Sequence, residues 1–152
     1  MKQKIKLKKK YKARVGAKFS ETDAQKIGEE LDNLKNTRGH LTSKVVLEAA
    51  RDTNSILHRY FEWETSKAAR SWNLQQARML INHIVEVIIV NKQPVEQRSF
   101  LSVTDKDIGQ VYVTIDVAIN NDDYRQQLLD KMIHIQENLI TTLRMFKDYD
   151  RK

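Results

Sequence analysis

Residues 84–90 read Ile-Val-Glu-Val-Ile-Ile-Val, and this stretch marks the change of pattern that decides the fold class. On its N-terminal side, apolar residues recur every three or four positions, which is typical of amphipathic helices. From Ile84 onward β-branched residues are dense and polar positions begin to alternate with apolar ones, which favours strands. The chain therefore predicts an α+β protein in which helices precede a small sheet.

Three short strands are expected after this change. They are Ile84–Val90, Gln97–Val103 and Val111–Ile115, separated by turn residues 91–94 and 105–109. Consecutive short strands joined by turns usually pair as neighbours, so residues 84–116 predict a three-stranded antiparallel β-meander. One face of so small a sheet must pack on helices to be stable.

Three helices are expected before the sheet, over residues 21–36, 43–51 and 66–82. Ser20 begins the first, because its hydroxyl can accept from free N–H groups and acidic residues follow it in the first turn. Thr42 is the corresponding capping residue of the second helix. With a short helical turn after Ser55, these elements predict an N-terminal three-helix subdomain over residues 19–83.

A long helix is expected in the C-terminal segment, residues 117–152. It begins at Asn120 or Asn121 and continues to residue 148, with a heptad-like apolar stripe formed by Leu128, Met132, Ile135, Leu139 and Phe146. A stripe of this kind favours self-association into a homo-dimer or higher oligomer. Packing of the helix within its own chain is the alternative.

The positive charge of the protein is concentrated at its N-terminus. The net charge is +7, yet residues 1–18 alone carry nine basic and no acidic side chains, while residues 19–152 carry 18 basic and 20 acidic ones. This pattern predicts a basic flexible arm over residues 1–18 that contacts nucleic-acid phosphates. The residues assigned to this contact are Lys4, Lys6, Lys8, Lys9, Lys10, Lys12, Arg14 and Lys18. A solubilising tail is the alternative, and the alternation over residues 4–8 also leaves room for an edge strand.

The polar face of the third helix is a second candidate contact. Lys67, Arg70, Asn73 and Arg78 could reach phosphates and base edges. Three helices with short connections are compatible with a variant of the helix-turn-helix motif, in which this helix would read the sequence. The alternative is an ordinary solvated helix face.

No catalytic or metal-binding pattern stands out. The chain has no cysteine, its four histidines are far apart in sequence, and its four glycines form no phosphate-binding loop. We therefore expect neither an enzyme nor a bound metal, cofactor or small-molecule substrate. No apolar run approaches the roughly 20 residues of a membrane span, so we also expect no membrane association and a cytoplasmic location.

One segment resembles a known group of proteins. It reads LTSKVVLEAARD at 41–52, LHRYFEW at 57–63, KAA at 67–69 and QAR at 76–78. These residues resemble a family of small, uncharacterised bacteriophage and prophage proteins, in which a strand pair and a C-terminal helix follow. The resemblance implies a phage-encoded protein in a bacterial host cell or in the virion, and it implies no catalytic residues.

Taken together, these features predict a phage-encoded nucleic-acid-binding protein, with DNA favoured over RNA. The alternative is a non-enzymatic structural or adaptor protein of a phage particle, assembled through its long helix.

Overall fold

The structure is a computed structural model that describes residues 9–63 and 66–149. The chain divides into two compact units, residues 1–114 and residues 115–152, and each is described by itself. Within the described residues, the first unit contains four helical segments and five strands, and the second contains two helices. The α+β class expected from the sequence is confirmed.

The predicted helices are present with boundaries close to those expected. They are α1 (Glu21–Arg38), α2 (Ser43–Ala50) and α3 (Lys67–His83), with the short 3₁₀ segment η1 (His58–Tyr60) between the last two. Ser20 caps α1 by accepting from the Asp23 N–H at 3.1 Å, and Thr42 caps α2 by accepting from the Val45 N–H at 3.1 Å. Gly39 ends α1 in the left-handed region at φ 77°.

The connection between α2 and α3 is longer than the short one expected for a helix-turn-helix variant. Residues 51–66 separate α2 from α3, whereas the motif joins its two helices by a turn of about three or four residues. Nor do the helices form a subdomain of their own, because Ile84, Phe100 and Tyr112 from the strand region belong to the same apolar core as Ile27 and Leu31 of α1.

The single three-stranded meander is also wrong. Strands β1 (Tyr11–Ala13), β2 (Ile84–Val90) and β3 (Gln93–Arg98) form one antiparallel sheet, and β4 (Leu101–Asp105) and β5 (Gly109–Val113) form a second, two-stranded one. The expected strand 97–103 is interrupted at Ser99 and Phe100, which are 2% and 1% exposed. Because Phe100 inserts into the core at this point, the chain leaves one sheet and enters the other.

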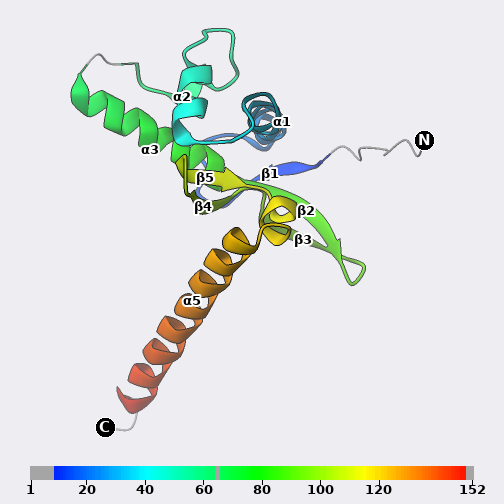
Figure 1. Cartoon of the computed structure of the whole chain (residues 1–152), viewed down its shortest axis with the longest axis vertical. Coiled ribbons are helices and arrows are strands. Elements are labelled where there is room, and N and C mark those ends of the chain that lie inside the picture. The colour runs from blue at the N-terminus through cyan, green and yellow to red at the C-terminus, as the bar shows by residue number, and fades with distance from the viewer. Residues whose placement is uncertain (1–8, 64–65, 150–152) are drawn as a thin grey trace. The chain divides into compact units, whose positions relative to one another are not determined.

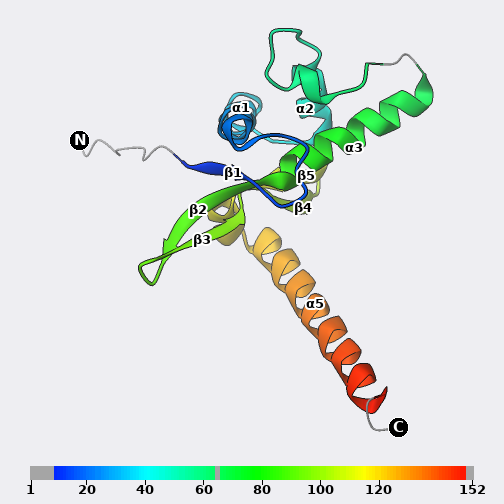
Figure 2. The ribbon, with the colours of Figure 1, turned by 180° about the vertical axis from the view of Figure 1, so that it is seen from behind.

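Strands β2 and β3 form a ribbon whose turn projects from the first unit (Figures 1 and 2). Asn91 and Lys92 form the turn, and both have positive φ (51° and 65°). Positive φ at both positions is required in a two-residue hairpin turn whose twist matches that of the flanking strands. The expected break at residues 91–94 is thus shorter, and Pro94 lies within β3. Since β3 is an edge strand, the missing N–H of Pro94 leaves no ladder partner unpaired.

The segment predicted as a flexible arm, residues 1–18, includes the strand β1. Tyr11 pairs with Glu86 and Ala13 pairs with Ile84, so residues 11–13 form a strand along the start of β2. The Tyr11 side chain is 4% exposed and its ring covers Gly28 of α1 so closely that a Cβ at position 28 would overlap the ring. Lys4, Lys6 and Lys8, and the edge strand considered over residues 4–8, lie outside the described residues.

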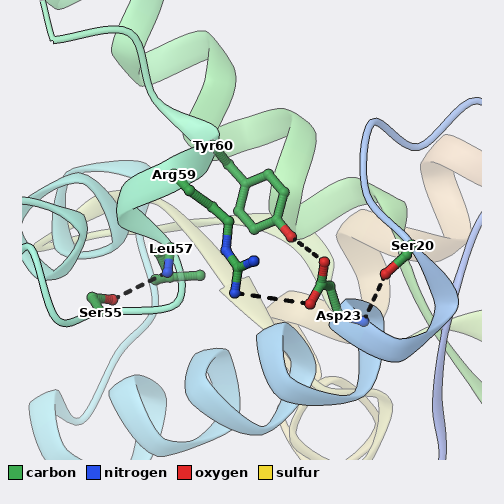
Figure 3. Close-up of polar contacts among 6 residues, drawn as sticks. All are labelled: Ser20, Asp23, Ser55, Leu57, Arg59 and Tyr60. Atoms are coloured by element: carbon green, nitrogen blue, oxygen red, sulfur yellow. Dashed lines mark hydrogen bonds and ion pairs between the residues drawn. The ribbon is translucent and has the colours of Figure 1, made fainter.

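The segment between α2 and α3 is fixed to the start of α1 by a polar cluster (Figure 3). The Tyr60 hydroxyl donates to Asp23 Oδ2 at 2.8 Å, and the Arg59 guanidinium lies 3.9 Å from Asp23 Oδ1. The hydrogen bond from Tyr60 is the largest cause of a lowered Asp23 pKa, while burial and the same bond raise the pKa of Tyr60 to about 12. The cluster therefore favours the Asp23 carboxylate in its ionised form.

The second unit consists of α4 (Ile115–Ile119) and α5 (Asp122–Tyr149). Asn121 precedes α5, and its Oδ1 accepts from the Tyr124 N–H at 3.0 Å. The long helix expected from the sequence is therefore present. The expected strand 111–115 ends at Val113, and α4 was not predicted.

Substituting Gly28 by Ala should destabilise the fold by about 1–3 kcal/mol, because the added methyl group overlaps the buried Tyr11 ring. At an ordinary helix position the same change stabilises by about 1 kcal/mol, so the sign of the effect is diagnostic. Urea denaturation measures it. In a Tyr11→Ala background the overlap is gone, and Gly28→Ala should then stabilise; stabilisation in the wild-type background would contradict the contact.

Replacing Tyr60 by Phe should raise the pKa of Asp23 toward its usual 3.8, because the main stabiliser of the ionised form is lost. A carboxyl group whose pKa is lower in the folded state than in the unfolded state stabilises the fold at pH values above the unfolded-state pKa. This contribution is lost as the pH falls through the folded-state pKa. The variant should therefore lose less stability than the wild type on acidification. Carboxyl-carbon NMR titration gives the pKa, and an unchanged Asp23 pKa in Tyr60→Phe would contradict this role.

Candidate nucleic-acid interface

The described basic residues of the N-terminal segment fall into two groups. Lys9 lies 3.7 Å from Asp32, and Lys12 donates to Glu96 at 2.7 Å, so both charges are partly neutralised by the body. Lys10, Arg14 and Lys18 are exposed and form no ion pair with any residue between 9 and 149 that the structure describes. These three remain available to a polyanion.

The four residues predicted on α3 do not form one contact surface. Arg70 and Arg78 are exposed, but Asn73 is only 6% exposed and is unavailable for base contacts. With its amide nitrogen turned toward the protein, Asn73 donates to the Glu62 carbonyl at 2.8 Å. Asn73 therefore has a structural role in holding the segment before α3. The Lys67 side chain lies outside the described residues.

Arg78 instead lines a groove formed by segments that are distant in sequence. The groove has a volume of about 630 Å³ and is called the cationic groove below; its lining residues are Arg38, His40, Thr42, Ser43, Lys44, Val45, Glu48, Arg78, Ile108 and Gln110. They come from the end of α1, the start of α2, the middle of α3 and the β4–β5 hairpin. All four elements belong to the first unit.

A backbone contact brings these segments together. The Tyr112 N–H of β5 donates to the Leu41 carbonyl at 2.8 Å, so the β4–β5 hairpin lies against the connection between α1 and α2. Leu41 is completely buried and Tyr112 is 2% exposed, which fixes the positions of His40 and Thr42 beside them. Burial raises the pKa of Tyr112, and the nearby charge of Arg78 partly offsets that rise.

The charges in the cationic groove are unbalanced. Arg38, Lys44 and Arg78 are exposed, and none of them lies within ion-pair distance of a carboxylate in the described part of the chain. Glu48 is the one acidic residue among the described lining residues. The groove therefore has a formal charge of +2 with neutral His40, and its chemistry favours an anion.

Sequence reasoning found Arg78 but missed Arg38 and Lys44. Each of these is a single basic residue at a helix end, and neither belongs to a charge run that would draw attention. Their convergence depends on the long-range contact between Leu41 and Tyr112, which no local pattern encodes.

A second cavity, of about 70 Å³ and lined in part by Lys18 and His83, holds at most a few water molecules.

The predicted self-association residues lie on an exposed apolar face of α5. Met132, Ile135, Leu139 and Phe146 are 59%, 66%, 58% and 69% exposed, and Leu128 is half-buried. Further exposed apolar side chains on the same helix are Leu129, Ile133, Ile140, Leu143, Met145 and Tyr149. So much exposed apolar surface on one helix is typical of an interaction surface.

Among residues 9–63 and 66–149, no helix has the length and apolar character needed to span a bilayer, and no three potential metal ligands cluster. Comparisons with protein-family models, with curated proteins and with solved structures find no match to this chain.

Proposed function

We propose that this protein binds nucleic acid and that lysines of its N-terminal segment supply most of the affinity. The observation that carries the proposal is the separation of charge: nine basic and no acidic residues over 1–18, followed by a remainder with slightly more acidic than basic residues. Lysines that neutralise phosphates release condensed counterions, which drives binding without any need for sequence recognition.

The position of β1 supports this proposal. Because Tyr11 is anchored in the core, the segment before it begins at the edge of the β1–β2–β3 sheet. The exposed Lys10, Arg14 and Lys18 lie on either side of β1 and add to the same basic region. We favour DNA as the partner and a phage or prophage origin, on the resemblance of residues 41–78 to phage proteins.

Replacing Lys2, Lys4, Lys6 and Lys8 together by Gln should weaken binding to duplex DNA and reduce its salt dependence. Each lost phosphate contact removes about 0.9 from the slope of log affinity against log salt concentration, so the slope should fall by up to about 3.6. Fluorescence anisotropy with a labelled duplex, measured over a range of salt concentrations, tests this. The substitutions leave Tyr11 and the rest of the core unchanged, whereas deletion of residues 1–18 would remove Tyr11.

The matched control replaces Lys26, Lys92, Lys131 and Lys147 by Gln, which changes the net charge equally at positions outside the N-terminal segment. This control should keep most of the affinity. Equal losses in the two variants would show that only net charge matters, and no binding by the wild type at low salt would refute the proposed function.

The apolar face of α5 supports a second function, that of a self-assembling structural or adaptor protein. The two functions are compatible, since α5 belongs to a different unit from the basic segment. A helix with this much exposed apolar surface gains stability by burying it, at about 25 cal/mol per Å² removed from water. We propose that this face is covered by other copies of the chain, in a homo-dimer or higher oligomer.

Substituting Ile135 and Leu139 by Glu should abolish self-association, because charged side chains would then be buried in the contact. Sedimentation velocity should show an oligomer for the wild type and a monomer for this variant. The control places Glu at His134 and Thr141, which lie on the opposite, polar side of the helix by its 3.6-residue period. A monomeric wild type at all concentrations would contradict the assembly function.

A further inference from the structure

We propose that the cationic groove binds a phosphodiester group of the nucleic-acid backbone. This inference rests on the proposed function and assigns to it a contact site on the folded body, separate from the N-terminal lysines. Three basic side chains from α1, α2 and α3 converge there, at Arg38, Lys44 and Arg78.

The charge arrangement favours an anion of high charge density. Like charges that converge on one groove repel each other, and a bound anion relieves that repulsion. Three other lysines of the first unit are paired with carboxylates, Lys9 and Lys35 with Asp32 and Lys12 with Glu96. In the cationic groove, by contrast, the one carboxylate among the described lining residues, that of Glu48, forms no ion pair with the three cations around it.

The neutral lining residues add donors suited to phosphate oxygens. The Thr42 hydroxyl oxygen accepts from the Val45 N–H, so its hydrogen can donate to a ligand. The Gln110 amide donates one hydrogen to Ser102 Oγ at 3.0 Å and has a second to offer. The two guanidinium groups present planar N–H pairs that match phosphate geometry. The backbones that carry these donors are helices and a hairpin of the same unit.

The size of the groove favours a phosphate within a polymer over a free ion. A volume of about 630 Å³ is within the range of ligand pockets that hold a whole small molecule, and exceeds what a single phosphate group fills. Ile108, which is 48% exposed, and Val45 give part of the lining an apolar character. That part of the groove suits the sugar and base attached to the phosphate.

The test uses the full-length protein with Lys44 and Arg78 both replaced by Gln. Its matched control replaces Lys26 and Arg51 by Gln, an exposed lysine and an exposed arginine that do not line the groove. Anisotropy titrations with a duplex and with a single-stranded oligonucleotide, each over a range of salt concentrations, compare the two variants. Inorganic phosphate and a mononucleotide are titrated separately, followed by the amide NMR signals of residues 42–44.

Loss of one backbone phosphate contact should weaken oligonucleotide binding and reduce the salt slope by about 1 relative to the control. The charge-preserving variant Lys44→Arg with Arg78→Lys should restore the slope. Equal slopes in the Lys44/Arg78 and Lys26/Arg51 variants would overturn the inference while leaving the proposed function intact.

Two other results would also overturn it. If the mononucleotide or inorganic phosphate binds the groove as tightly as the oligonucleotide does, the site takes a free phosphate and not a phosphodiester. If the wild type binds no oligonucleotide at low salt, the proposed function fails together with the groove assignment. The variant with four N-terminal substitutions separates the two sites, because groove binding should persist in it.

Discussion

The contact between the Tyr11 ring and Gly28 determines how the basic N-terminal segment is attached to the protein. Glycine at position 28 allows the ring to lie directly on the backbone of α1, and β1 is thereby held between α1 and β2. Burial of the ring raises the pKa of Tyr11 well above its usual range, as expected of a phenol in the core. The lysines that precede Tyr11 in the sequence are thus joined to the body at this contact.

A second long-range contact, between Leu41 and Tyr112, forms the cationic groove, which we propose as a site for anions. It joins the two-stranded sheet to the helix connection and so places three chain segments around one groove. The two basic regions differ in character. The N-terminal segment carries nine basic residues that are close in sequence, whereas the three basic residues of the cationic groove come from three different helices. Neutralisation of many phosphates increases affinity and the rate of encounter. Phosphate contacts at fixed positions on the protein determine the register of the bound nucleic acid.

Local chemistry made much of this fold predictable. Ser20 and Thr42 cap their helices as expected, and the β-branched run from Ile84 to Val90 is a strand with the predicted bounds. The errors share one cause, which is tertiary packing. Tyr11 lies in a stretch dominated by lysines, yet burial of one aromatic ring is enough to order a strand there. Phe100 lies within an alternating pattern, yet its insertion into the core divides that pattern between two sheets. Asn73 has a polar side chain on a helix with a polar face, but a neighbouring loop covers it.

The width of the apolar face on α5 constrains what can cover it. A two-stranded coiled coil buries a narrow seam of positions spaced alternately three and four residues apart, which here includes Met132, Ile135 and Leu139. Leu129, Ile133, Ile140 and Leu143 lie beyond that seam and are 39% to 59% exposed. A single partner helix would leave this second row in water, so the face fits a bundle of more than two helices better than a simple pair. Each added copy would also bring another basic N-terminal segment, and several such segments on one nucleic acid bind with higher avidity than the same number of separate chains. Assembly and nucleic-acid binding would then reinforce each other within one particle.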